Sequence, residues 1–254
     1  MIKDKVIKDK ERTVMTRKDA RQKVFNEGTR LALPEGRKIR VAITLGQGSQ
    51  VIDVAVPWEI FQDVLVNDSP VFELYTVGAS NDVVRMSGGM LVAPNYTVFD
   101  APQPDVIVSP AHHCTPEIIE WLKKASVMAD LTTSLCTGVY HLAEAGLLEG
   151  LVATTFHTDF DNFANRFPDI QLSREQTFVD QGHVITAGGL SAGIDMSLHI
   201  VGRYFGLDIA QQTAHFIEYD NWKQDFAKAT VKEVSKERSM ERSRDGGLRE
   251  FSCA

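Results

Sequence analysis

The sequence predicts an α/β fold in which a mostly parallel sheet carries helices on both faces. Over residues 37–222, short apolar segments alternate with segments whose apolar residues recur at helical spacing, which is the pattern of βαβ units. The chain has 254 residues, 43% of them hydrophobic and 24% charged. These values are typical of a folded globular protein and exclude a mainly disordered, collagen-like or disulfide-stapled chain.

Charge and hydropathy divide the chain into a basic N-terminal extension (1–36), a single domain (37–222) and a charged C-terminal tail (223–254). Lys and Arg outnumber Asp and Glu by 13 to 6 in residues 1–40, whereas residues 41–220 hold 6 basic and 22 acidic residues. So acidic a core binds phosphate backbones poorly, and we expect no nucleic-acid partner. The basic extension is expected to lie on this acidic core, with an anionic partner as the alternative.

Targeting signals and the number of cysteines indicate the cellular compartment of the protein. No apolar run approaches the roughly 18 to 20 residues that span a bilayer, and the N-terminus has no apolar signal region. The three cysteines are odd in number, which indicates thiols in a reducing compartment. We therefore expect a cytoplasmic protein without a membrane partner.

The first half of the domain begins with a buried strand at Ile39–Leu45. Apolar residues at helical spacing then predict a helix over Gln50–Val66, kinked or divided by the internal Pro57. Two further apolar runs predict strands at Phe72–Val77 and Asp105–Ser109.

The second half continues the alternation. A helix is expected at Thr115–Ala125 because Thr115 suits its cap and Pro116 its first position. The remaining expected elements are a strand at Ala129–Leu135, a helix marked by apolar residues from Val139 to Leu147, two strands around a turn within Phe178–Ile185, and closing helices at Leu190–Phe205 and Asp208–Tyr219.

The most informative motif surrounds Cys136, where a predicted strand runs into the cysteine, a small residue and a helix. This is a strand–nucleophile–helix turn, and it lies at the carboxyl edge of the sheet, where open α/β folds bind ligands. The helix N-terminus is expected to lower the pKa of the thiol. The motif G-x-C-x-G is incomplete because Ser134 replaces the first glycine, and the alternative is a buried, inert cysteine.

The chain resembles the DJ-1/PfpI (ThiJ) family of the glutamine-amidotransferase-like superfamily, most of all its isonitrile-hydratase-like branch. The resemblance covers roughly residues 38–222 and rests on Val51–Asp53, Pro57, Glu59–Phe61, Ser134–Gly150, Ala153–His157, Arg166–Asp169 and Ala187–Asp195. It implies a flavodoxin-like sandwich with Cys136 as the nucleophile, and a homodimer, because relatives often dimerise.

The resemblance also implies partners for the cysteine. Asp53 stands where the family places a carboxylate against the sulfur, and it could pass a proton to the substrate; alone, it reads as a helix N-terminal acid. His157 stands where relatives place a histidine near the nucleophile, as a base or orienting group. Glu59 is a candidate second inward carboxylate, with a solvated charge as the alternative.

One departure from the family concerns the oxyanion hole. Relatives commonly read P-G-G after the third strand, whereas this chain reads Pro110-Ala111-His112-His113-Cys114. The backbone N–H of His112 could still pair with that of Thr137 to stabilise developing charge, with Ala111 and Gly138 beside them. The absence of glycine at positions 111 and 112 could instead alter the turn.

Metal chemistry is not expected, because adjacent residues seldom ligate one ion and no further ligand set accompanies His112, His113 and Cys114. His141 is expected to be structural and to point elsewhere. We predict no cofactor and cysteine-dependent hydration or hydrolysis of a small electrophile, such as an isocyanide giving an N-substituted formamide. The alternatives are a glyoxalase-like enzyme for reactive carbonyls and a redox or ligand sensor without turnover.

Overall fold

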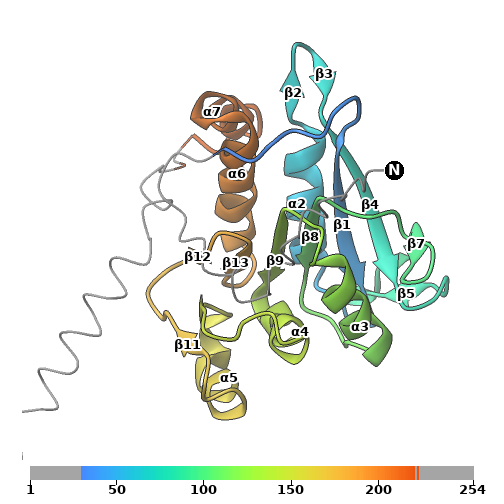
Figure 1. The fold of residues 1–254 in the computed structure, drawn as a ribbon, viewed down its shortest axis with the longest axis vertical. Helices are drawn as coiled ribbons and strands as arrows, with labels where there is room; N and C mark the ends of the chain where they lie inside the picture. Colours follow the sequence, from blue (N-terminus) through green and yellow to red (C-terminus); the bar gives the residue numbers. More distant parts are fainter. Residues whose placement is uncertain (1–29, 221, 223–254) are drawn as a thin grey trace, which may run out of the picture.

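The computed structural model describes residues 30–220 and residue 222. The predictions for most of the N-terminal extension and for the C-terminal tail lie outside the described residues. A seven-stranded sheet has the strand order β12-β13-β9-β8-β1-β4-β7, and all its neighbours pair in parallel except β12 and β13. Its strands are β1 (Ile39–Leu45), β4 (Phe72–Gly78), β7 (Tyr96–Thr97), β8 (Val106–Ser109), β9 (Leu131–Leu135), β12 (Phe178–Asp180) and β13 (Val184–Ala187) (Figure 1).

Helices and short paired strands complete the regular structure of the described residues. The helices are α2 (Val51–Gln62), α3 (Pro116–Ala125), α4 (Val139–Glu144), α5 (Phe160–Arg166), α6 (Ala192–Phe205) and α7 (Leu207–Phe216), with 3-10 turns η1 (Ser87–Gly89), η2 (Cys136–Gly138) and η3 (His157–Asp159). Paired two-residue strands are β2 (Leu65–Val66) with β3 (Ser69–Pro70), β5 (Val84–Arg85) with β6 (Leu91–Val92), and β10 (Val152–Ala153) with β11 (Gln171–Leu172).

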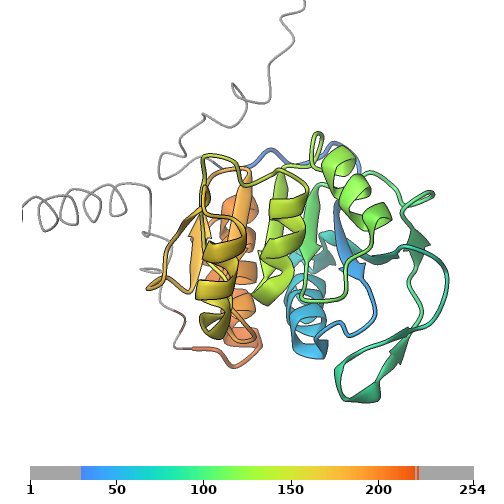
Figure 2. The same cartoon turned by 90° about the horizontal axis from the view of Figure 1, so that it is seen from below.

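The sheet has one apolar core on each face, which confirms the predicted layers. On β1, Ile39, Val41 and Ile43 pack into the core formed with α2 and α6, whereas Ala42 belongs to the core formed with α3 and α4. This alternation is the two-residue period of a strand buried on both faces. Figure 2 shows α2 and α3 on opposite sides of the sheet.

Two boundaries in the first half differ from the prediction. The helix predicted to reach Val66 ends at Gln62, because Asn67 and Asp68, with φ of 50° and 57°, turn the chain into the β2–β3 hairpin. Of the two effects predicted for Pro57, division of the helix is wrong, since α2 continues through this buried residue, and a kink stays a prediction. A proline lacks a backbone donor, yet the buried face of α2 holds the helix together across it.

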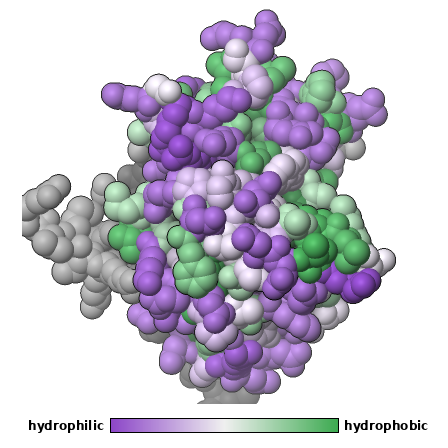
Figure 3. Space-filling view, turned by 90° about the vertical axis from the view of Figure 1, so that its right-hand side faces the viewer, coloured by the Kyte–Doolittle hydropathy of each residue, from purple (hydrophilic) through white to green (hydrophobic). Residues whose placement is uncertain are grey.

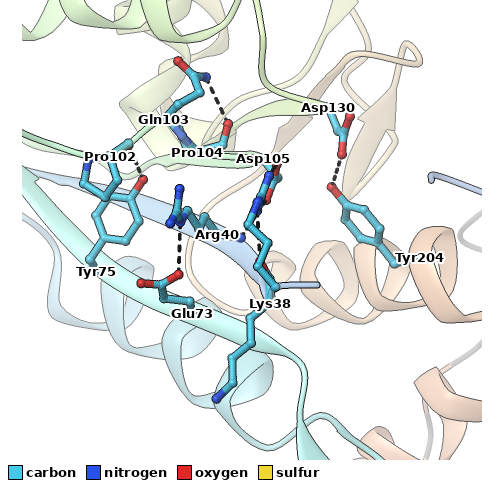
Figure 4. Close-up of polar contacts among 11 residues, drawn as sticks. Lys38, Arg40, Glu73, Tyr75, Pro102, Gln103, Pro104, Asp105, Asp130 and Tyr204 are labelled. Carbon is cyan, nitrogen blue, oxygen red and sulfur yellow. Dashed lines mark hydrogen bonds and ion pairs between the residues drawn. The ribbon is translucent and has the colours of Figure 1, made fainter. Parts of the chain in front are cut away.

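The amino edge of the sheet is closed by ion pairs and hydrogen bonds. Asp105, just before β8, receives two hydrogen bonds from the Arg37 guanidinium, of 2.6 and 2.9 Å, and one from the Arg40 backbone N–H. Figure 4 shows the contacts of Arg40 with Glu73 and of Tyr204 with Asp130, at 3.1 and 2.9 Å. Every one of these contacts joins separate elements at their ends.

The surface is largely hydrophilic with local apolar areas. Figure 3 shows such areas on the side of the molecule where Figure 1 places β5 and β7. Exposed large apolar side chains in or beside these strands include Val83, Leu91 and Phe99. Within the described residues, no helix is long and apolar enough to cross a membrane.

Candidate active site

Cys136 lies at a strained turn between β9 and α4. Its φ is +55°, in the left-handed region that residues other than glycine rarely adopt. The turn is held on both sides, because the Cys136 N–H donates a 3.0 Å hydrogen bond to the Gly188 carbonyl and its carbonyl accepts one of 3.0 Å from Thr155 Oγ1. Strain of this kind persists where the surroundings enforce it, and it is typical of functional sites.

Asp53, in the first turn of α2, is completely buried beside the cysteine. The Leu190 backbone N–H donates a 3.3 Å hydrogen bond to Asp53 Oδ1, and Leu190 itself has a φ of +59°. Among the described residues, no partner with good hydrogen-bond geometry faces Oδ2. The buried carboxyl group therefore has one oxygen held in place and one available for a proton.

Burial shifts the pKa values of both groups upward. It raises the pKa of Asp53 to about 6, although the Ala111 and Leu190 backbone and the Cys136 thiol stabilise the carboxylate. It also raises the pKa of Cys136 to about 11, with the negative charge of Asp53 adding to the shift and Thr137 opposing it. Between these values the pair holds one proton, on the sulfur. The predicted lowering of the thiol pKa is thus wrong, because burial and a neighbouring carboxylate outweigh the short helix.

Thr137 and Gly138 form the rest of the turn. Hydrogen bonding by the Thr137 backbone and side chain opposes the rise in the pKa of Cys136, and the role of the Thr137 N–H in stabilising charge on a substrate stays a prediction. Gly138 is buried, and a Cβ there would overlap the Ser109 carbonyl at the end of β8. Glycine is therefore required at position 138, because the turn lies so close to β8 that a side chain would not fit.

The non-glycine turn after β8 keeps its backbone within reach of the site. Ala111 is buried, its backbone is directed to Asp53, and its carbonyl accepts a 3.0 Å hydrogen bond from the Gln50 N–H. The His112 ring packs against Gly46, where a Cβ would clash with His112 Nδ1 and the His113 carbonyl. Glycine in the loop after β1 thus compensates for the missing glycines of the turn after β8.

His141 is buried and directed to Ser109 and His112, in keeping with the structural role expected for it. Its ring lies 4.3 Å from that of His112, centroid to centroid. Its Nε2 faces the His112 carbonyl at 3.1 Å and its Nδ1 the Ser109 hydroxyl at 2.9 Å; His112 Nδ1 faces the His113 carbonyl at 3.0 Å and its Nε2 the Thr44 hydroxyl at 2.9 Å. Because a carbonyl only accepts, the nitrogen facing it carries the hydrogen. Burial lowers the pKa of His112 to about 4 and that of His141 to about 3.

An open, polar pocket of about 510 Å³ adjoins the elbow. Thr137 is the member of the turn that lines it, whereas Cys136 itself does not. The other lining residues are His112, Cys114, Tyr140, His141, Glu144, Asp159, Asn162 and Arg166. Arg166 forms an ion pair with Glu144 across the pocket lining.

Two predicted site residues lie apart from the Cys136–Asp53 pair. Glu59 is exposed on α2. It is therefore a solvated surface charge, and the prediction of a second inward carboxylate is wrong. His157 is also exposed, and its ring lies 4.5 Å from that of Phe156. No hydrogen bond joins His157 to Cys136 or Asp53 among the described residues, and its role as a base stays a prediction without a supporting contact.

These features define an α/β protein with a buried cysteine at a strained strand-to-helix turn. The family model described as DJ-1/PfpI family matches residues 39–203, and the chain belongs to this family. A solved THiJ/PfpI family protein from Pseudomonas syringae superposes with a TM-score of 0.65 at 24% identity, covering 74% of this chain and 77% of that one. The predicted flavodoxin-like fold is confirmed.

Curated relatives include an enzyme and regulators. The chain is 26% identical over 213 residues to the isonitrile hydratase of Pseudomonas putida, over 79% of this chain and 90% of that enzyme. It is 27% identical over 148 residues to the HTH-type transcriptional regulator CdhR of Pseudomonas aeruginosa, over 56% of this chain and 44% of the regulator. The chain thus spans less than half of that regulator, and the family relationship alone does not distinguish catalysis from ligand sensing.

Proposed function

We propose that the protein is a cysteine-dependent enzyme that hydrates an isocyanide to an N-substituted formamide. The single observation that carries this proposal is the buried Asp53–Cys136 pair, which holds one proton between about pH 6 and pH 11. A group poised near neutral pH beside a nucleophile is suited to general acid–base catalysis. The similarity to the isonitrile hydratase of Pseudomonas putida supports the same chemistry.

The pair accounts for each proton of the reaction. Asp53 takes the thiol proton while the Cys136 sulfur bonds to the isocyanide carbon, and it returns that proton to the same carbon, which leaves a thioimidate. Asp53 then takes a proton from water while the water oxygen bonds to that carbon, and it passes this proton to the nitrogen. As the C–S bond breaks, the new hydroxyl group becomes the formamide carbonyl and its proton passes through Asp53 to the sulfur, so that isocyanide and water give the formamide and the free thiol. The donors of Thr137 and the His112 N–H would stabilise developing charge.

A non-catalytic ligand sensor is the second candidate, favoured by the similarity to CdhR. In that case the pocket beside Thr137 would bind a metabolite without turnover. Sensing by peroxide is less well supported, because a thiol whose pKa is about 11 has little thiolate at neutral pH. A glyoxalase-like reaction would use the same pair on a reactive carbonyl.

The deciding experiment incubates the purified protein with cyclohexyl isocyanide, and separately with methylglyoxal, and follows products by mass spectrometry. The proposal predicts the formamide from the isocyanide, and none from the Cys136→Ala variant. Turnover of methylglyoxal alone would select the glyoxalase-like function. Ligand-induced stabilisation without turnover would select the sensor. Turnover lost in Cys136→Ala but unchanged in Asp53→Asn would refute the role of the carboxylate.

The family relationship also supports a cytoplasmic homodimer that takes a small-molecule substrate and needs no nucleic-acid or membrane partner. Light scattering of the full chain tests the dimer directly, since a monomer and a dimer of a 28.2 kDa chain differ twofold in mass.

A further inference from the structure

Three metal-ligating side chains meet at the pocket, outside the Cys136–Asp53 pair. One ligand atom from each of His112, Cys114 and His141 lies within 4.8 Å of the other two. Ligand atoms bound to one tetrahedral zinc ion lie about 3.3–3.7 Å apart, given bonds of roughly 2.0–2.3 Å. Small side-chain rotations would therefore bring the three atoms into a coordination shell.

Both imidazoles are already held by hydrogen bonds of the kind that support metal ligands. Each ring has one nitrogen on a backbone carbonyl and the other on a hydroxyl. Coordination through one nitrogen replaces one of these hydrogen bonds and keeps the other, which then fixes the ring, as it does for most histidines that bind metals. The Thr44 and Ser109 hydroxyls, which lie 3.5 Å apart, can bond to each other when a ring is engaged.

Access and charge also favour a cation. The three side chains line the open pocket of about 510 Å³ together with the carboxyl group of Asp159, and with Glu144, which is paired with Arg166. A metal held there by three protein ligands has room for a water or another small ligand in the fourth position. Structural zinc sites have four protein ligands, whereas sites with three protein ligands and one open position are the reactive kind.

We propose that His112, Cys114 and His141 form a three-ligand site for a thiophilic transition metal, with Zn²⁺ as the ion to test. A thiolate and two imidazoles select zinc or copper over magnesium or calcium, which prefer oxygen. Binding releases the Cys114 thiol proton to solvent as the sulfur–metal bond forms. The proposal does not depend on isocyanide hydration.

The test titrates the full-length, EDTA-treated protein with Co²⁺, a spectroscopic substitute for Zn²⁺, and then displaces it with Zn²⁺. The expected result is one equivalent bound, with a sulfur-to-cobalt charge-transfer band that Zn²⁺ abolishes. Cys114→Ala should lose the band and bind about 100-fold or more weakly, since even outer-shell changes cost 10–100-fold. His141→Ala should weaken binding likewise. Circular dichroism of each variant checks that it is folded.

Cys136→Ala is the matched control, because it removes the other described thiol near the pocket and should keep the band. A band lost in Cys136→Ala and kept in Cys114→Ala would overturn the proposal, as would binding only at millimolar metal. Because the readout is the metal spectrum, its failure is separate from a failure of formamide production.

Discussion

The amino and carboxyl edges of the parallel sheet differ in how their charged groups and backbone are held. At the amino edge, Asp105 accepts three hydrogen bonds from Arg37 and Arg40, and Tyr204 bonds to Asp130 (Figure 4). At the carboxyl edge, Cys136 is held at a positive φ, and no ion pair among the described residues involves the buried Asp53. The contacts at the amino edge neutralise charges and join separate elements, whereas the carboxyl edge combines backbone strain with a buried carboxyl group. Strain of this kind is typical of functional sites, which makes the carboxyl edge the place to test for activity.

The largest expected effect comes from relieving the strain at the elbow. Cys136→Gly removes the nucleophile and should lower formamide production by about 1,000-fold or more. The same change should raise the free energy of unfolding by about 1 kcal/mol, because glycine adopts a positive φ without strain. Urea unfolding and product analysis on the same sample test both parts. A destabilised variant would show that the elbow is not a strained position.

The second effect separates the charge of Asp53 from its shape. Asp53→Asn should lower turnover by roughly 100-fold or more, the usual contribution of a general acid–base group. The wild-type rate should rise with pH through about 6 as the carboxyl ionises, and the variant should lack this limb.

Stability should change in the opposite direction in the same variant. The raised pKa means that folding favours protonated Asp53, so its contribution to stability is present below the unfolded value of 3.8 and is lost as the pH rises through about 6. Asp53→Asn should therefore unfold at a higher temperature than wild type above pH 6, with no difference below pH 4. Equal melting temperatures at all pH values would contradict the burial of an ionisable carboxyl group.

A third change tests the amino edge. Burial raises the pKa of Asp105, but the bonds from Arg37 and the Arg40 N–H outweigh it and the net pKa is lowered. Asp105→Asn should cost about 1–2 kcal/mol at pH 7, and this cost should disappear as the pH falls below the usual carboxyl range. Turnover per folded molecule should not change. A loss of turnover without a loss of stability would show that the two edges are coupled.

The smallest effect is expected at His157. Because its ring is exposed and packs on Phe156, His157→Ala should reduce turnover less than about threefold, a much smaller loss than general acid–base groups give. A loss as large as that of Asp53→Asn, with the fold intact by circular dichroism, would restore the predicted role of His157 as a base.

Local pattern accounts for much of this fold and for the position of Cys136 at a strand-to-helix turn. Strand periodicity predicted β1, β4, β8 and β9, and the sequence around Cys136 indicated an elbow. Boundaries shifted where backbone geometry decides, as at Gln62, where α2 gives way to a hairpin. Short paired strands such as β5 and β6 carry too little periodicity to be recognised.

The parts of the site that sequence reasoning missed depend on contacts between distant segments. His141 was expected to point away from Cys136, but the sequence did not show that the loop after β8 brings His112 onto its ring. The raised pKa of Cys136 likewise arises from burial and from Asp53, which lies on another helix. The run of His112, His113 and Cys114 after an apolar strand indicated the right loop. It gave no indication that His141, on α4, packs against that loop.

The most direct test of the one-proton pair is the rate of Cys136 alkylation by iodoacetamide against pH, measured by mass spectrometry of the peptide that contains Cys136. We expect slow alkylation at pH 7, a rise toward pH 11, and an apparent thiol pKa that falls in Asp53→Asn because a negative charge is removed. A thiol that alkylates fully at pH 7 with an apparent pKa below 7, unchanged in Asp53→Asn, would contradict it.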